Sequence, residues 1–378
     1  MTSKKPGSRV KWSRRVARIA SVAVLAAILI GGATASLTSG ATTADQDFAA
    51  RCAAAGVVRC WGFDSQADFA PDSKGPKVFA SNNGTGPIQA SLDTTVKVSG
   101  ASSLKFSLPS NAGTDWGGSW HSNFADDFSV QFGEGETFYV QYRARFDPGL
   151  LRQFKTVDGS PRGWKTSIIG EGSQANQPET YSCTELEIVW QQDSRPFSQN
   201  QPGVKFGFPS QYHSCGNFDT YEWNDGTQIV LQHPRPPLAK VYYPNDPNGT
   251  GFYYFPNEWM TFKIRVDIGT WNTPNSRIRW YAAREGQPSV LIQDTADKSP
   301  GGIVLHNTPG SGSGTNPGAK YGKVWLIPYH TNKDASESYT PTAMWFDELI
   351  VSRNDIADPG SGPRDTLAPA SPAQLSVR

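Results

Sequence analysis

The feature that most constrains the fold of this chain is a series of short segments in which apolar and polar residues alternate. The clearest is 137–146, where Phe138, Val140, Tyr142 and Phe146 fall on one side of an extended chain. The other side carries Tyr139, Gln141, Arg143 and Arg145. A period of two residues indicates a β-strand with one buried face and one exposed face.

The same alternation recurs along the chain, and no helical periodicity of useful length appears after residue 60. The longer candidate strands are 184–191, 261–268, 277–281, 323–329 and 343–351, and the shorter ones are 103–106, 165–169 and 204–208. The 37 Gly and 28 Pro residues disfavour a helical protein, and an aromatic content of 12% disfavours a disordered one. We therefore predict an all-β jelly-roll sandwich of two antiparallel sheets.

The first 35 residues have the organisation of an export signal. They contain seven Lys and Arg and no acid, followed by an apolar stretch at 19–30 and an A-x-A site that ends at Ala35. The stretch is shorter than the roughly 20 residues of a membrane-spanning helix. We expect a secreted protein of bacterial type, with an uncleaved N-terminal anchor as the alternative.

The rest of the chain is acidic. The net charge of the whole is +1, so removal of the seven leader cations leaves a formal charge of −6. Nucleic-acid and anionic-membrane partners require basic surface, and we expect neither for the mature protein. We predict a linker at 36–57, a monomeric jelly-roll domain at 58–356, and a disordered tail rich in Pro, Ala and Ser at 357–378.

Four cysteines suit an oxidising compartment, where disulfides form. Three pairings are open, and the order along the chain favours Cys52–Cys60 and Cys183–Cys215, each of which closes a local loop. Free or metal-bound thiols are the alternative, although no C-x-x-C spacing supports zinc.

Segments near both ends of the predicted domain resemble the first and last strands of concanavalin A-like lectin/glucanase domains. They are Cys60 to Asp64, Gly100 to Phe106 and Trp345 to Ser352. The resemblance implies a polysaccharide partner. Within that superfamily, the order of polar motifs is similar to that of alginate-lyase-type polysaccharide lyases.

Those lyases carry an R-T/S-E-L strand, a Q-x-H strand and a strand that ends in a catalytic Tyr. The corresponding segments here are Cys183 to Leu186, Gln211 to His213 and Lys323 to Tyr329. Cys183 stands where the family has an arginine, and the third motif keeps only a lysine and the final tyrosine.

A lyase removes the proton at C5 of a uronate and expels the sugar linked through O4, which requires a base, an acid and a partner for the carboxylate. The resemblance implies His213 as the base and Tyr329 as the acid. Gln211 and Gln191 are candidates to bind the carboxylate. Further substrate-binding candidates are Glu187, Lys323, Arg143 and Arg145, and the cationic row of Arg277 and Arg279.

Several alternatives stay open. His121 and His330 compete with His213 for the histidine role. Glu185 and Glu187 resemble half of the carboxylate strand of jelly-roll glycosidases, although Trp190 stands where the second catalytic acid belongs. Tryptophans in loop contexts also suit a non-catalytic, lectin-like module.

No cofactor is predicted, and no catalytic metal. A structural calcium site is the one exception that we consider, because carboxylate oxygens are ligands that calcium prefers. Its candidate ligands are Asp64, Asp225 and Asp347.

Overall fold

The computed structural model divides the chain into two units, Met1–Gly40 and Ala41–Arg378, and all residues that it describes belong to the second. These residues are 43–71, 77–79, 89–110, 118–151, 164–171, 187–193, 208–213, 252, 254–297, 300–305, 320–330, 333–334, 336–338 and 340–360. The predicted export signal at 1–35 and the predicted Cys183–Cys215 disulfide lie outside them.

Two antiparallel sheets make up this unit. Sheet A has nine strands in the order β12-β11-β10-β6-β15-β4-β3, with β1 paired to β15 and β13 paired to β11. Its strands are β1 (Val57–Trp61), β3 (Gln89–Asp93), β4 (Ser103–Leu108), β6 (Thr137–Phe146), β10 (Met260–Asp267), β11 (Pro274–Ala283), β12 (Val290–Asp294), β13 (Ile303–Val304) and β15 (Thr342–Ser352).

Sheet B has six strands in the order β2-β5-β14-β7-β8-β9. They are β2 (Val78–Phe79), β5 (Ser119–Asn123), β7 (Trp164–Glu171), β8 (Glu187–Asp193), β9 (Phe208–His213) and β14 (Tyr321–His330). The described helices are α1 (Thr43–Cys52) and the 3₁₀ turns η1 (Gln66–Phe69) and η2 (Thr295–Asp297).

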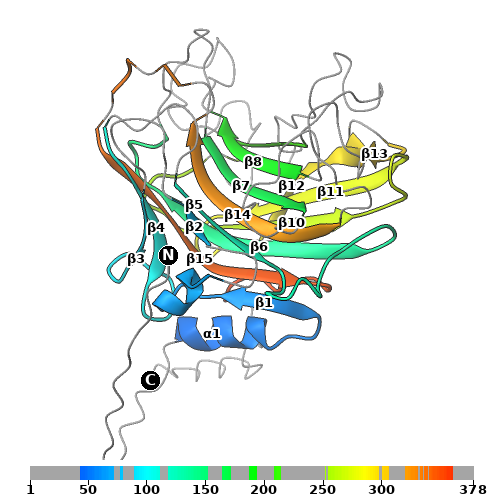
Figure 1. The fold of residues 1–378 in the computed structure, drawn as a ribbon, viewed down its shortest axis with the longest axis horizontal. Coiled ribbons are helices and arrows are strands. Elements are labelled where there is room, and N and C mark those ends of the chain that lie inside the picture. Colours follow the sequence, from blue (N-terminus) through cyan, green and yellow to red (C-terminus); the bar gives the residue numbers. More distant parts are fainter. Residues whose placement is uncertain are drawn as a thin grey trace, which may run out of the picture. The chain divides into compact units, whose positions relative to one another are not determined.

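The hydrophobic core lies between the two sheets, which form separate layers in Figure 1. Phe138, Val140 and Tyr142 of β6 enter it from sheet A, and Val324 and Leu326 of β14 enter it from sheet B. All five side chains are at most 1% exposed. The alternation predicted from the sequence is therefore confirmed, and so is the all-β jelly-roll sandwich.

A polar contact between side chains crosses this core. The hydroxyls of Tyr142 on β6 and Ser167 on β7 lie 2.9 Å apart and share a hydrogen bond. Burial raises the pKa of Tyr142 to about 12, so its hydroxyl stays protonated at neutral pH. The bond links sheet A to sheet B at a fixed position.

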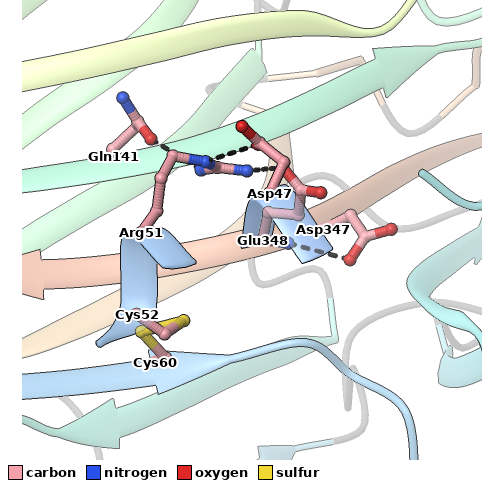
Figure 2. Close-up of a disulfide and its surroundings, with 7 residues drawn as sticks. All are labelled: Asp47, Arg51, Cys52, Cys60, Gln141, Asp347 and Glu348. Carbon is pink, nitrogen blue, oxygen red and sulfur yellow. Dashed lines mark hydrogen bonds and ion pairs between the residues drawn. A yellow bond between two sulfur atoms is a disulfide. The ribbon is translucent and has the colours of Figure 1, made fainter. Parts of the chain in front are cut away.

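The predicted linker at 36–57 includes helix α1 (Thr43–Cys52), which is folded against sheet A. Helix α1 has Asp45 in its first turn and Arg51 in its last, which suits the helix dipole. Arg51 donates to Asp47 one turn earlier, to Gln141 on β6 and to Glu348 on β15, as Figure 2 shows. These contacts to the sheet explain why a segment with weak amphipathic character is helical.

The predicted Cys52–Cys60 disulfide is present and joins the end of α1 to β1 (Figure 2). Beside it, Phe48 packs against Ile350 and Ile356 on the face of sheet A that is turned away from sheet B. We call this the outer face of sheet A. Helix α1 therefore covers part of that face.

The start of the predicted disordered tail is also held on the outer face of sheet A. The backbone oxygen of Ala357 accepts a hydrogen bond from Gln141, and the backbone nitrogen of Gly360 donates to Asp47. Lys263 Nζ reaches the backbone oxygen of Ile356 at 2.9 Å. The described structure thus extends to residue 360, and the rest of the predicted tail lies outside it.

A bulge interrupts β15 where α1 meets it. The pairing with β6 shifts between Asp347 and Ile350, and Glu348 has a positive φ of 51°, which is uncommon for a residue other than glycine. Asp347 accepts hydrogen bonds from the backbone nitrogens of Val98 and Glu348, each at 2.8 Å. Burial raises the pKa of Asp347 to about 8, so this carboxyl group is mostly protonated at neutral pH.

Replacing both Cys52 and Cys60 by Ser is expected to lower the free energy of unfolding by about 2 kcal/mol, because the short loop between them is no longer closed in the unfolded chain. Chemical denaturation of the oxidised protein and of the double variant measures the difference. Equal midpoints and slopes would contradict the contribution of this bridge.

Arg51→Met is expected to destabilise the fold by about 3–5 kcal/mol, because it leaves the buried carboxylate of Glu348 without its cation. The side chains of this ion pair are 4% and 1% exposed. Urea denaturation checks the loss, and the double variant Arg51→Met/Glu348→Gln should recover part of it. A double variant no more stable than Arg51→Met would show that lost packing, and not the uncompensated charge, causes the effect.

Candidate functional site

The face of sheet B that is turned away from sheet A carries several of the predicted site residues. We call it the outer face of sheet B. Strand β14 defines it, because Val324 and Leu326 enter the core whereas Trp325 and Ile327 pack together on the opposite side with Tyr329. Lys323 alternates with Val324 and belongs to the same outer face.

Tyr329 lies in a row that crosses three strands. It is paired with Lys165 on β7, which is paired with Gln191 on β8. The ammonium of Lys165 lies 4.4 Å from the centroid of the Tyr329 ring. Both side chains are only half-buried. The fold thus brings two predicted residues, Tyr329 and Gln191, to either side of a lysine that solvent can reach.

A second row on the same face is mostly apolar. It contains His121 on β5, Trp325 on β14 and Ile168 on β7. The imidazole of His121 is 5% exposed. Burial lowers the pKa of His121 well below its usual value, and the positive charges of Lys323 and Lys77 lower it further. His121 is therefore a neutral imidazole at neutral pH.

A third row holds two more of the predicted residues. Lys323 on β14 is paired with Asn123 on β5 and with Gly170 on β7, and Gly170 is paired with Glu187 on β8. Lys323 is 1% exposed, and its ammonium lies 5.6 Å from the centroid of the Trp325 ring. Lys323 and the Glu187 position therefore share one end of the outer face of sheet B.

The backbone register places His213 and Gln211 on the other face of sheet B. His213 is paired with Ile188, and Ile188 with Ile169, which packs in the core. Gln211 is two residues away on the same strand. Strand β9 is also three strand positions from β14, or about 14 Å at the usual strand spacing. The catalytic role of His213 stays a prediction, and the fold does not bring its position to that of Tyr329.

Arg143 and Arg145 belong to the other sheet. They lie on β6, where they alternate with the core residues Tyr142 and Ala144, and so they face outward from sheet A. The sandwich separates them from the outer face of sheet B. Alternation in the sequence predicts that two residues share a face, but it does not predict which sheet the strand joins.

The paired cations of β11 lie on the outer face of sheet A as well. Arg277 is bound to Asp294, and Arg279 to Asp267 at 3.2 Å. Like Arg143, they are remote from Tyr329, and their carboxylate partners give them a structural role in the sheet.

The other histidine candidate, His330, is buried and close to the ring of Trp164.

Of the calcium candidates, Asp347 accepts the backbone bonds described above, and Asp64 accepts bonds from the backbone nitrogens of Ala101 and Ser102. Asp225 and Glu185 lie outside the described residues. Among the residues that are described, no three His, Cys, Asp or Glu side chains are grouped to hold a metal ion. Calcium stays a prediction.

Lys165 is the site residue that the sequence analysis did not single out. It lies in a segment identified as a short strand, at a position that alternates with residues of the core. No motif marks it, and only the pairing of β7 with β14 brings it to Tyr329.

The part of the chain that the structure describes contains no helix long and apolar enough to span a membrane.

Solved structures with a similar fold include carbohydrate-active and carbohydrate-binding proteins. A marine alginate lyase from Aplysia kurodai is 11% identical, with a TM-score of 0.48, and the match covers 79% of this chain and 99% of the lyase. An endo-β-1,4-glucuronan lyase from the fungus Trichoderma reesei is 10% identical, with a TM-score of 0.38 and coverages of 75% and 93%.

The exoplasmic/lumenal domain of VIP36, in a form bound to Ca²⁺ and Man3GlcNAc, is also 10% identical, with a TM-score of 0.33 and coverages of 76% and 89%. No protein-family model matches the chain, and no curated protein sequence does so. At these identities and TM-scores the likenesses carry no conclusion about the family or activity of this chain, and its all-β sandwich rests on its own two sheets.

The buried imidazole of His121 is expected to make stability depend on pH. The unfolded chain binds a proton near pH 6.5, whereas the folded protein binds it only at lower pH, so stability falls as the pH drops below about 6.5. One such group contributes a slope of up to about 1.4 kcal/mol per pH unit. Urea denaturation between pH 7.5 and 5 measures it, and His121→Gln should flatten the curve. An unchanged slope in the variant would contradict the lowered pKa.

Proposed function

We propose that this protein is a secreted lyase that cleaves a uronate-containing polysaccharide by β-elimination on the outer face of sheet B. The observation that carries the proposal is the contact between Lys165 and Tyr329. Together they offer a positive charge and a proton-transferring group that solvent can reach on one face of the sandwich. The basic leader at 1–35 supports export, which would bring the protein to extracellular polymers.

The chemistry requires the negative charge of the uronate to be offset before C5 can lose its proton. Lys165 supplies that positive charge, and the position of Gln191 in the same row suits a hydrogen bond to the carboxylate. A lysine, unlike a carboxylate, does not repel an anionic polymer.

We assign the proton transfers to Tyr329. In its phenolate form it takes the proton from C5, and the electrons of the C5–H bond form the C4=C5 double bond. The C4–O4 bond breaks, and the leaving O4 takes the proton back from the phenol. A single tyrosine can do both when the C5 hydrogen and O4 lie on the same side of the sugar ring. The ammonium of Lys165 lies over the Tyr329 ring and so would stabilise its phenolate form.

Neither histidine is needed in this scheme. The His213 position is three strands from β14 and in register with the core face of sheet B. His121 is opposite Trp325, which is four residues, or about 13 Å, along β14 from Tyr329. At the level of the backbone, neither position is next to that of Tyr329.

Tyr329→Phe is expected to lower kcat by about 100-fold or more, because it removes the proton-transferring hydroxyl. Lys165→Gln should lower kcat/KM by a similar factor. The measurement is the ultraviolet absorbance of the unsaturated uronate released from alginate, glucuronan and heparin-type polymers. Lys320→Gln, which removes an exposed lysine just before β14, is the matched control and should retain full activity.

Three results would contradict the proposal. Absence of an unsaturated product with retained binding would indicate a lectin-like module. New reducing ends without the unsaturated product would indicate a glycoside hydrolase that uses Glu185 or Glu187. Formation of an unsaturated product that depends on His213 but not on Tyr329 would show that His213, as the sequence predicts, is the catalytic base.

A further inference from the structure

The arginines on the outer face of sheet A differ in how well they are paired. Those on β10 and β11 each have a carboxylate within 3.2 Å, and Arg265 and Arg279 share Asp267. They are Arg265, Arg277 and Arg279. Two arginines on the neighbouring strand β6 do not follow this rule.

Arg145 forms no ion pair with any residue that the structure describes, and Arg143 reaches only Glu285, at 3.5 Å. The Glu285 side chain is 55% exposed, so this pair is weak. Both arginines have a buried Nε that meets no acceptor among the described residues, and the Nε of Arg279 shares this condition. An unsatisfied buried donor costs stability, and Arg145 differs from Arg279 in having no described carboxylate partner to offset that cost.

Tryptophans lie on both sides of Arg145. Trp345 is its partner on β15, and Trp259 precedes the residue of β10 that is paired with Ala144. The two indoles belong to one cluster on the outer face of sheet A and are 7% and 4% exposed. They exclude water from the stem of Arg145, which is itself half-buried, and a charge in such surroundings attracts an anion more strongly.

The charges around the two arginines largely cancel, and Arg145 is the arginine left without a carboxylate of its own among the described residues. The carboxylates that act on Arg143 are Glu348, Glu285 and Asp347, and Arg51 opposes them. Asp347 is mostly protonated at neutral pH because burial raises its pKa to about 8. Arg51 is itself bound to Asp47 as well as to Glu348, so with Asp347 neutral the three arginines face three carboxylates and their charges cancel. Nearby, Lys105 and Asp93 form an ion pair at 3.2 Å and cancel each other.

We propose that Arg143 and Arg145 form a second, non-catalytic binding site for a carboxylate-bearing sugar on the outer face of sheet A. The two side chains project from the same face two residues apart, about 7 Å along β6. Each guanidinium can bind a carboxylate with two parallel hydrogen bonds.

This site lies on the opposite side of the sandwich from Lys165 and Tyr329. It would hold a second stretch of the same polymer, or a second chain, while the other face cleaves. The choice of uronate as ligand rests on the proposed function, whereas the anion site itself rests on the arginines.

The experiment is calorimetric titration of the full chain carrying Tyr329→Phe with tetrasaccharides of mannuronate, guluronate and glucuronate. We expect two classes of site for at least one of them. Adding Arg145→Gln should weaken one class at least tenfold and leave the other unchanged. Arg145→Lys keeps the positive charge but loses the forked donor geometry of the guanidinium, and it should weaken the same class of site less. If the Arg145→Gln variant does not fold, Arg145→Lys is measured in its place.

Arg265→Gln is the matched control, because it removes a cation from the same face while Arg279 still pairs with Asp267. Binding that Arg145→Gln leaves unchanged, or that Arg265→Gln weakens equally, would overturn the site. A sulfated tetrasaccharide and polyglutamate are the comparison ligands, and equal binding of polyglutamate would overturn the specificity for sugar. The site would still appear, as a single class, if the proposed cleavage on sheet B were wrong.

Discussion

The aromatic layer between the two sheets is the interaction on which the rest of this structure depends. Phe138, Tyr142 and Phe262 of sheet A are in it, with the ring centroids of Tyr142 and Phe262 5.7 Å apart. Because every second residue of a strand is committed to this layer, the remaining residues must face outward. The two outer faces, and therefore all candidate binding chemistry, are consequences of how the core is filled.

The two outer faces have different surroundings. On sheet A, helix α1 and residues 355–360 pack on the strands, and most cations have acid partners. On sheet B, three rows of residues lie across the strands, and the row that contains Lys165 and Tyr329 remains partly open to solvent. One face is thus partly covered by the first and last described segments, whereas the other offers reactive groups.

The features that the sequence predicted correctly are those that depend on one strand or one short loop. Alternation in 137–146 predicted both the strand and its buried face, and the spacing of Cys52 and Cys60 predicted their bridge. The sequence did not predict which strands are neighbours. Lys165 was therefore missed, and Arg143 was expected to bind substrate although it lies on sheet A, across the sandwich from Tyr329. Helix α1 was missed for a similar reason, because its contacts come from residues almost 300 positions away, such as Glu348.

The hydrogen bond from Gly360 to Asp47 has a consequence for how the sandwich is connected. The first helix and the last described residue lie side by side, so the polypeptide path is nearly closed on itself. A short linker could join residues 43 and 360, and new ends could be opened elsewhere in the ring without removing a strand from either sheet. A circular permutant would then change the order of the strands along the chain while keeping their order in the two sheets.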